Sequence, residues 1–489
     1  MFKWFFDRSK IVMLLAILSI GLGCVSTPEP KPYGPVPTQR QLTWQNMEYY
    51  AFLHFNMNTF TNREWGHGKE KQNAFNPTEL DTDQWCRIFK KAGMTGVVIT
   101  AKHHDGFCIW PSKKTKHSVA HSQWRNGKGD VLAELSKSCK KYGLKFGVYI
   151  SPWDRNNPIY GKDDAAYNKY FEDQLTELLT HYGEIFEVWW DGANGDRNNP
   201  DKHQEYDWPA FVKLVRKLQP NAVMFSDAGP DIRWIGTERG HAGTTNWSTM
   251  NRDDLRPGIR GKNKILHAGQ KGGTHWLPGE VDVSIRPGWY YHKNQDARVK
   301  KLKHLAKIYH ASVGRNSNLL LNIPIDRRGL VHENDEKELL QLRVYLDQAY
   351  KTDLARGSKI IAEPIRGAGF EGQALNDGDD ASYWATKDEQ TTGEFTVIFD
   401  KAQDVNRVVL KEHIKLGQRV EAFEVHVKTA KGWKKVASAT TIGYKRIISF
   451  KRIKATQVKI KITKALACPT IGTFEVYNAI EVDEFLSKK

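Results

Sequence analysis

Residues 81–101, DTDQWCRIFKKAGMTGVVITA, contain the unit that decides the fold. Asp81 can cap a helix, because its carboxylate can accept hydrogen bonds from free backbone N–H groups of the first turn. The apolar side chains of that helix share one face: Trp85, Ile88, Phe89 and Ala92. Gly93 can adopt the left-handed conformation that ends a helix, and the apolar run at 94–101 predicts a buried strand.

The same unit recurs twice downstream. Gly143 ends a second predicted helix before an expected strand at 144–150, and Gly183 ends a third before an expected strand at 184–190. Further candidate strands lie at 51–60, 221–227, 233–236, 265–268 and 318–325. Apolar strands that alternate with helices are typical of a parallel sheet covered by helices. We therefore expect an α/β fold in which residues 40–350 form a (β/α)8 barrel of about eight strands.

The pattern changes after residue 350. Short runs of alternating apolar and polar residues appear, such as FTVIF at 395–399, FEVHV at 423–427 and VKIKI at 458–462. A period of two between turn residues predicts antiparallel strands. Residues 355–480 are therefore expected to form a separate antiparallel β-sandwich.

The N-terminus carries an export signal. Lys3, Arg8 and Lys10 precede an apolar stretch at 11–22 that is too short to span a bilayer. The sequence GLGC at 21–24 resembles the end of a bacterial lipoprotein signal, which implies a signal at 1–23, acylation of Cys24 and a tether at 24–39. The alternative is an ordinary cleaved signal. Either way we expect export, and with the lipid the chain would be a periplasmic or surface lipoprotein held to the membrane through its anchor only.

The 489-residue chain has 73 Lys and Arg against 56 Asp and Glu, a net charge of +17. Residues 431–464 contain eleven Lys or Arg and no acidic residue, which suits either an anionic polymer or a solvated face of alternating strands. We find no nucleic-acid motif, so no nucleic-acid partner is expected. The cysteines after Cys24 lack zinc-site spacing and are expected to be buried free thiols, with a disulfide left open: Cys86, Cys108, Cys139 and Cys468.

Polar residues mark four of the predicted strands: the first carries His54, and the next three run into KHHD at 102–105, SPWD at 151–154 and WWDG at 189–192. In a (β/α)8 barrel the carboxyl ends of the strands form the active site, so these side chains are expected to share one rim. Adjacent histidines His103 and His104 do not both face one metal in ordinary backbone, so we expect no metal. One of Trp189 and Trp190 is expected in the core, because neighbouring strand residues point to opposite faces.

These strings resemble a known family. KHHDGF at 102–107, VWWDG at 188–192, and the downstream strings GGTHWLPGE at 272–280 and SIRPGWY at 284–290 are similar to glycoside hydrolase family 29, the retaining α-L-fucosidases, over residues 40–350. The resemblance implies a cofactor-free exo-α-L-fucosidase whose partner is a fucosylated oligosaccharide or glycoconjugate. Residues 355–480 resemble discoidin-like or galactose-binding-like modules, which implies a possible carbohydrate-binding module.

The resemblance also implies catalytic roles. A retaining glycosidase needs a nucleophilic carboxylate and a carboxylic acid that donates and then recovers a proton. Asp191 matches the family's nucleophile. The string DIRWIGTE at 231–238 resembles the branch that cleaves α-1,3 and α-1,4 fucosyl linkages, so Glu238 is expected to be the acid/base, with Glu280 as the rival.

By the same resemblance, nine further residues are expected to bind the sugar. Those expected to hold the hydroxyls and ring are His54, Glu64, Trp65, His103, His104, Arg233 and Trp289. Trp153 and Trp189 are expected to pack on the apolar face and C6 methyl group, since aromatic rings suit the C–H face of a sugar. Two alternatives stay open: a related α-L-glycosidase, acting on an α-L-galactoside or a fucosylated anionic polysaccharide, and a non-catalytic carbohydrate-binding protein on a disabled barrel.

Overall fold

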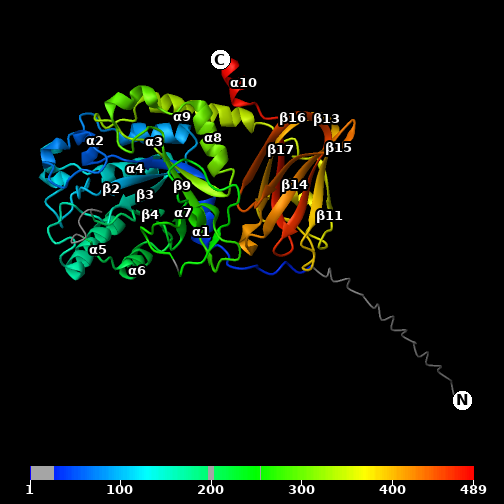
Figure 1. Ribbon diagram of the computed structural model, residues 1–489, viewed down its shortest axis with the longest axis horizontal. Helices are drawn as coiled ribbons and strands as arrows, with labels where there is room; N and C mark the ends of the chain where they lie inside the picture. The colour runs from blue at the N-terminus through cyan, green and yellow to red at the C-terminus, as the bar shows by residue number, and fades with distance from the viewer. Residues whose placement is uncertain (2–26, 196–202, 254, 489) are drawn as a thin grey trace.

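The computed structural model describes residues 1, 27–195, 203–253 and 255–488 (Figure 1). The signal predicted at 1–23, apart from residue 1, and the lipidation site Cys24 lie outside these described residues. Figure 1 shows a barrel covered by helices beside an all-β part. Within the described ranges, no helix combines the length and apolar character needed to cross a bilayer.

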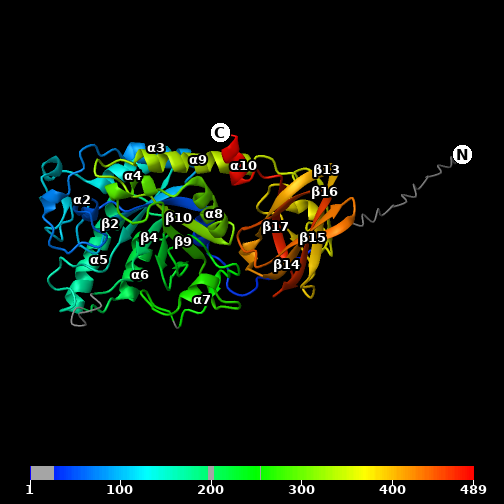
Figure 2. The same ribbon diagram turned by 45° about the horizontal axis from the view of Figure 1, so that its top comes forward.

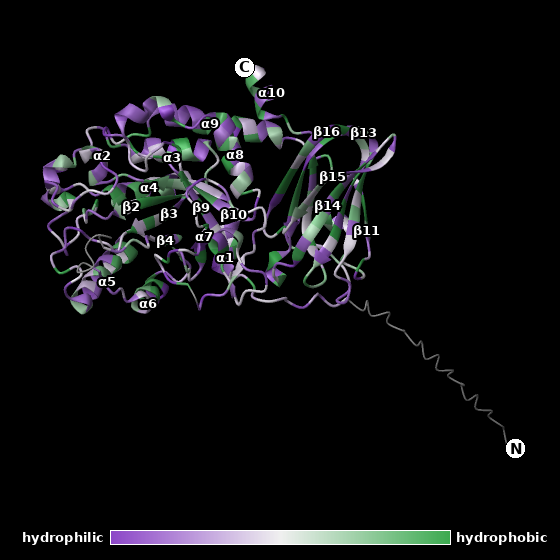
Figure 3. Ribbon diagram, viewed as in Figure 1, coloured by the Kyte–Doolittle hydropathy of each residue, from purple (hydrophilic) through white to green (hydrophobic). Residues whose placement is uncertain are grey.

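The described residues form one closed barrel of eight parallel strands, which confirms the predicted fold class. Going around the barrel, the strands are β1 (Tyr49–Leu53), β2 (Gly96–Lys102), β3 (Lys145–Ile150), β4 (Glu187–Trp190), β5 (Val223–Ser226), β6 (Ile232–Trp234), β9 (Gly279–Ser284) and β10 (Ser317–Asn322). All seven residues of β2 are buried, and Figure 3 shows this strand in hydrophobic colours. Because all strands run in the same direction, their carboxyl ends meet on one rim.

Helices surround the barrel. They are α1 (Gln39–Gln45), α2 (Met57–Thr61), α3 (Thr82–Lys91), α4 (Val131–Tyr142), α5 (Asp164–His181), α6 (Trp208–Leu218), α7 (Asn263–Ala268), α8 (Leu302–Ser312) and α9 (Glu333–Ala349), with α10 (Val482–Ser487) at the C-terminus. The predicted cap at Asp81 is confirmed, since its carboxylate accepts the N–H of Gln84 at 2.9 Å. Gly143 has a φ of 64° and ends α4 as predicted.

One predicted strand is wrong and another was predicted too long. Residues 265–268 lie in α7, a short helix in which only Leu266 is buried. The strand at this place in the barrel is β9, whose inward side chains include Glu280 and Asp282. These two carboxylates interrupt the apolar run by which a buried strand is predicted, so the sequence pattern did not indicate β9. The strand expected at 51–60 ends at Leu53, because Asn56 caps α2 through its side chain.

The second part is an antiparallel sheet that folds over its own core, as predicted. Its strands are β11 (Lys359–Glu363), β12 (Trp384–Ala385), β13 (Gly393–Glu412), β14 (Val420–Thr429), β15 (Gly432–Thr440), β16 (Arg446–Ala465) and β17 (Thr470–Tyr477). They pair in the order β12-β17-β13-β16-β14-β15, with β11 on β13. β13 and β16 are each 20 residues long, and their pairing shifts register along its length. β13 pairs with β11, β16 and β17, and β16 pairs with β13 and β14. A short pair, β7 (Thr249–Met250) with β8 (His275–Trp276), lies beside the barrel.

Five of the eleven basic residues at 431–464 form ion pairs with acidic residues that lie elsewhere in the chain. The ion pairs are Lys435–Glu424, Lys445–Glu48, Arg452–Glu484, Lys459–Glu394 and Lys464–Glu421. These pairs favour a solvated face over a site for an anionic polymer. The four described cysteines are buried, as predicted, and none of them takes part in a disulfide. Part of the predicted tether lies against the sandwich, where Tyr33 N donates to Leu416 O at 2.9 Å.

Candidate active site

The carboxyl ends of the barrel strands surround a cavity of about 1070 Å³. This volume exceeds that of one sugar ring and lies at the top of the range for small-molecule sites. Ten of the eleven residues predicted to act on or bind substrate line it: His54, Glu64, Trp65, His103, His104, Trp153, Trp189, Asp191, Glu238 and Trp289. The structure thus brings together residues that are up to 235 positions apart in the sequence.

Asp191 directly follows β4 and is held from both sides. Its Oδ1 accepts the N–H of Ala193 at 2.7 Å, and its Oδ2 accepts the hydroxyl of Tyr149 at 3.0 Å. His104 Nε2 lies 3.7 Å from the same Oδ2. The side chain keeps 28% exposure toward the cavity. A carboxylate fixed by donors on a strand end, yet open to the pocket, is arranged to act on a bound molecule.

Glu238 lies on the loop after β6. Its Oε2 accepts the indole N–H of Trp289 at 3.3 Å. Glu238 is exposed at the cavity. The protein around its carboxyl still removes part of its hydration, which raises the pKa of Glu238, and the negative charges of Asp191 and Glu64 raise it further. These effects favour the protonated carboxyl that a general acid requires.

Glu280, the predicted rival, lies beneath the floor of the cavity and does not line it. The side chain is fully buried: Oε1 accepts the N–H of Trp189 at 2.9 Å, and Oε2 bonds the hydroxyl of Tyr50. Burial raises its pKa to about 7. Since Trp189 separates Glu280 from the cavity, Glu280 supports the floor and does not reach a bound sugar.

The three histidines line the base of the pocket as neutral rings. Burial lowers the pKa of His54 to about 3, and it also lowers the pKa values of His103 and His104. Asn322 fixes the His54 tautomer: its Nδ2 donates to Ser284 Oγ at 2.9 Å, so its Oδ1, 2.8 Å from His54 Nδ1, accepts. The His54 Nε2 atom is then an acceptor for a substrate hydroxyl.

Aromatic rings form the walls. Trp189 stacks on Phe225 with ring centroids 4.1 Å apart, while Trp190 faces outward toward Trp208 at 5.6 Å, so the prediction that one of the tryptophan pair is core is confirmed. Trp153 lies against His104 at 4.9 Å. Trp65 meets Trp153 edge-on at 5.9 Å and is 52% exposed, so it stands at the mouth.

Glu64 joins the loop before β2 to the loop after β9. Its carboxylate accepts the backbone N–H of Trp289 at 3.0 Å and bonds the His292 ring at 2.6 Å. Glu64 therefore holds Trp289 in place while it also lines the cavity.

Arg233 was predicted to bind the sugar, but the structure places it outside the cavity. The residue is fully buried, and its guanidinium donates to Leu266 O at 2.9 Å, to Leu277 O and to Asn246 Oδ1 at 2.8 Å. It does not line the cavity, because this side chain points away from the barrel axis into the segment that holds α7. The family resemblance implied a sugar-binding role for Arg233, but alternation along β6 turns Trp234 inward instead.

The sequence reasoning missed several pocket residues, among them Tyr149, Asp227, Trp234 and Asp282. Asp282 accepts the indole N–H of Trp234 at 2.8 Å. Burial raises the pKa of Asp227 to about 6. The signal that could have found Tyr149 is alternation, since it has the same inward orientation on β3 that Trp189 has on β4.

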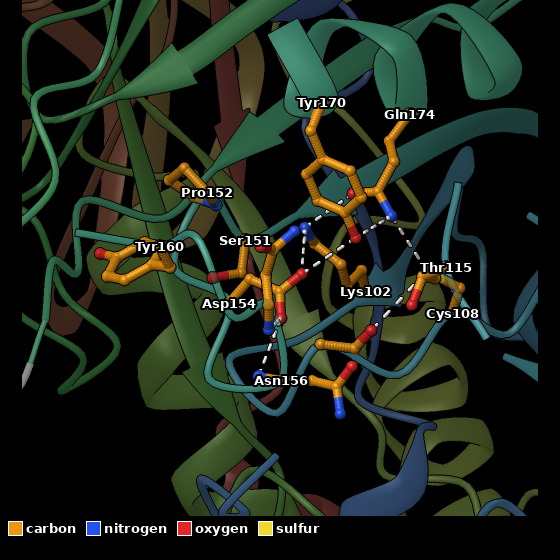
Figure 4. A network of polar contacts seen from close by, with 12 residues as sticks. Lys102, Cys108, Thr115, Ser151, Pro152, Asp154, Asn156, Tyr160, Tyr170 and Gln174 are labelled. Carbon is orange, nitrogen blue, oxygen red and sulfur yellow. Dashed lines mark hydrogen bonds and ion pairs between the residues drawn. The ribbon is translucent and has the colours of Figure 1, made fainter. Parts of the chain in front are cut away.

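A buried ion pair supports the two loops that carry His103, His104 and Trp153. Lys102 Nζ lies 3.3 Å from Asp154 Oδ2 and donates to Gln174 Oε1 at 2.8 Å. Figure 4 shows Lys102, Asp154, Tyr170 and Gln174 pointing toward one another. The Asp154 Oδ1 atom accepts the N–H of Asn156 at 3.0 Å, which fixes the turn after Trp153. Across the described residues, no three His, Cys, Asp or Glu side chains are grouped to hold a metal ion.

The sequence and fold match known proteins. A family model described as alpha-L-fucosidase matches residues 23–350, and one described as NedA-like, galactose-binding domain matches residues 374–460. Alpha-L-fucosidase 1 of Arabidopsis thaliana is 42% identical over 457 residues, covering 92% of this chain and 89% of the relative. The crystal structure of SpGH29 has a TM-score of 0.88 at 37% identity and covers 92% of this chain and 100% of that one. A Ruminococcus gnavus GH29 fucosidase, solved in complex with fucose, has a TM-score of 0.86 at 30% identity and covers 93% of this chain and 98% of that one.

Proposed function

The chain belongs to the alpha-L-fucosidase family and is a glycoside hydrolase, and we propose that it releases terminal α-1,3- or α-1,4-linked L-fucose from glycans with retention of configuration. The observation that carries the proposal is the presence of two carboxyl groups in one cavity, Asp191 held by fixed donors at a strand end and Glu238 with a raised pKa. The same observation argues against a disabled barrel that only binds sugar.

In the proposed reaction, an Asp191 oxygen attacks the anomeric carbon of fucose while Glu238 transfers its proton to the glycosidic oxygen. The bond between that carbon and oxygen breaks, the aglycone leaves as an alcohol, and fucose remains as an ester on Asp191. Glu238, now a carboxylate, then takes a proton from water, whose oxygen attacks the same carbon and frees Asp191.

The surrounding side chains suit this chemistry. Neutral His54, His103 and His104 can exchange hydrogen bonds with sugar hydroxyls without placing fixed positive charge beside Asp191. Trp189 and Trp153 offer apolar faces for the C–H side of the ring and the C6 methyl group. We propose that the β-sandwich adds a carbohydrate-binding role, in keeping with its match to a galactose-binding family.

We further propose that the chain is exported and anchored through a lipid on Cys24. This proposal rests on the basic and apolar leader and on the GLGC string at 21–24. Metabolic labelling with a fatty-acid probe, compared between the natural chain and Cys24→Ser, tests it: label lost in the variant supports the anchor, and no label in the natural chain contradicts it.

The linkage is tested by incubating the purified enzyme with a Lewis-type trisaccharide and with 2′-fucosyllactose. Fucose release from the trisaccharide alone supports the proposed linkage, whereas release from the α-1,2 substrate contradicts it. Proton NMR of the first fucose formed tests the stereochemistry, because retention yields the α-anomer before mutarotation and inversion yields the β-anomer.

A further inference from the structure

Arg233 is a buried cation whose bonds go to uncharged groups. Its donors reach the carbonyl oxygens of Leu266 and Leu277 and the side-chain oxygen of Asn246, and no described carboxylate forms an ion pair with it. Burial lowers its pKa to about 9. Because desolvating a guanidinium without a counter-ion is costly, its three-way bonding indicates a structural role for the segments it joins.

One of those segments holds the loop that carries Glu238. The bond from Arg233 to Leu266 O fixes α7 against β6. From α7, Asn263 Nδ2 donates to Gly236 O at 2.7 Å, two residues before Glu238. Gly236 has a φ of +80°, and a Cβ there would lie 2.7 Å from Asn263 O, so the chain can pass this close to α7 only as glycine. The contact with α7 therefore sets the path of the chain that leads to Glu238.

The other side of Arg233 leads to the β-sandwich, which lies beside the barrel in both views (Figures 1 and 2). The side-chain oxygen of Asn246 accepts a hydrogen bond from Arg233, and the backbone N–H of Asn246 donates to Thr441 Oγ1 at 3.0 Å. Its carbonyl accepts from Gln418 Nε2 at 3.1 Å, and Gln418 Oε1 accepts the N–H of Ser248 at 2.7 Å. Thr441 and Gln418 are buried residues of the sandwich.

We infer that Thr441 and Gln418 of the β-sandwich are positioning residues for the acid/base Glu238, acting through Asn246, Arg233 and α7. The inference rests on the proposed role of Glu238. Proton transfer to the leaving group depends on the placement of the acid to a fraction of an ångström, so loosening a distant support slows that transfer. The sandwich then serves catalysis as well as any carbohydrate it binds.

Thr441→Val tests this, because valine keeps the shape and removes the hydroxyl that accepts from Asn246. We expect kcat on a fucosylated oligosaccharide, whose leaving group needs protonation, to fall about tenfold. On a dinitrophenyl fucoside, whose leaving group does not, we expect a fall of less than about twofold. Thr441→Ser, which keeps the hydroxyl, should restore the natural ratio of the two rates.

Lys445→Met is the matched control. It breaks another contact between sandwich and barrel, the bond from Lys445 to Glu48 at 2.6 Å, without touching Asn246, and should leave the ratio of rates unchanged. Equal losses on both substrates, the same ratio change in Lys445→Met, or failure of Thr441→Ser to restore the ratio would each overturn the inference. If Thr441→Val does not fold, Gln418→Met is measured in the same way.

Glu238→Ala, measured in parallel, tests the acid/base role of Glu238 separately from the positioning role of Thr441. A large loss confined to the oligosaccharide upholds Glu238 as acid/base, and adding Thr441→Val to that background should then cause no further change. Additive losses in the double variant overturn the positioning role alone. Equal losses on both substrates in Glu238→Ala overturn the acid/base role and this inference with it.

Discussion

Tyr149 donates its hydroxyl hydrogen to Asp191 Oδ2 at 3.0 Å, from the neighbouring barrel strand. The two residues come from β3 and β4, and Trp189 stacks on Tyr149 at 5.2 Å, so the hydroxyl has little freedom to turn away. The nucleophilic oxygen of the proposed reaction is thus aimed by a rigid donor. This contact stabilises the carboxylate before attack and after release, when Asp191 regains its charge.

Tyr149→Phe removes that donor and keeps the ring. We expect kcat/KM for an aryl fucoside to fall about tenfold, because Asp191 Oδ2 is then no longer aimed at the anomeric carbon by a fixed donor. Steady-state kinetics measure the change. Tyr49→Phe, which removes a buried hydroxyl on β1 that has no described partner, is the control and should leave kcat/KM unchanged. Equal losses in both variants would contradict the role of Tyr149.

Asp191→Ala should lower kcat at least about a thousandfold while the circular dichroism spectrum stays that of the natural protein. The loss follows because no carboxylate remains to form the fucosyl ester. Azide can enter the vacated space and attack the anomeric carbon of an activated α-fucoside, releasing the aryl alcohol. The product expected from a retaining nucleophile site is a β-fucosyl azide, identified by NMR. Activity near the natural rate would refute the assignment.

The sequence predicted the barrel because its helices and strands follow local rules. Asp81 and Gly143 mark helix ends through backbone hydrogen bonding alone, and both were found where expected. It failed at β9, since Glu280 and Asp282 face inward and break the apolar pattern that marks a buried strand. Local sequence does not reveal that a barrel interior can hold paired polar groups.

Most of the pocket could also be predicted, because the strand ends converge in any closed parallel barrel. The resemblance misplaced Arg233, because a matched sequence string does not fix the direction of a side chain at a strand end, which the pleat sets and one residue of register reverses. The choice between Glu238 and Glu280 needed the structure: only the packing of Trp189 over Glu280 removes the latter from the cavity. The link from Thr441 to Asn246 spans 195 residues and has no sequence pattern.

Lys102→Met should destabilise the fold, since it leaves Asp154 buried as an unpaired carboxylate. We expect the free energy of unfolding to fall by about 3 to 5 kcal/mol, measured by urea denaturation. The double variant Lys102→Met with Asp154→Asn should recover part of that loss, because the uncompensated charge is gone. A double variant as unstable as the sum of both single variants would contradict a coupled pair.

From the raised pKa of Glu280 we predict that the free energy of unfolding depends on pH. Its pKa is raised to about 7 in the folded protein from 4.5, so the folded state binds its proton more tightly. Its contribution is full below pH 4.5 and is lost as the pH rises through about 7. The free energy of unfolding should therefore decrease over this range, and Glu280→Gln, which stays neutral, should flatten the decrease. Glu389→Gln, at an exposed glutamate, is the control and should leave the slope unchanged.

From the raised pKa of Glu238 we predict that activity on an oligosaccharide falls at high pH, where this carboxyl loses its proton. The first step needs Glu238 protonated, and its pKa is raised by partial loss of hydration and by the charges of Asp191 and Glu64. The kcat/KM for an oligosaccharide should therefore hold as the pH rises past the ordinary range of a glutamate and fall only as Glu238 loses its proton. A dinitrophenyl fucoside needs no protonation, so its profile should lack this basic limb. Glu238→Gln should abolish the limb for the oligosaccharide as well, at a much lower rate. A basic limb of the same midpoint with both substrates would assign it to a group other than Glu238.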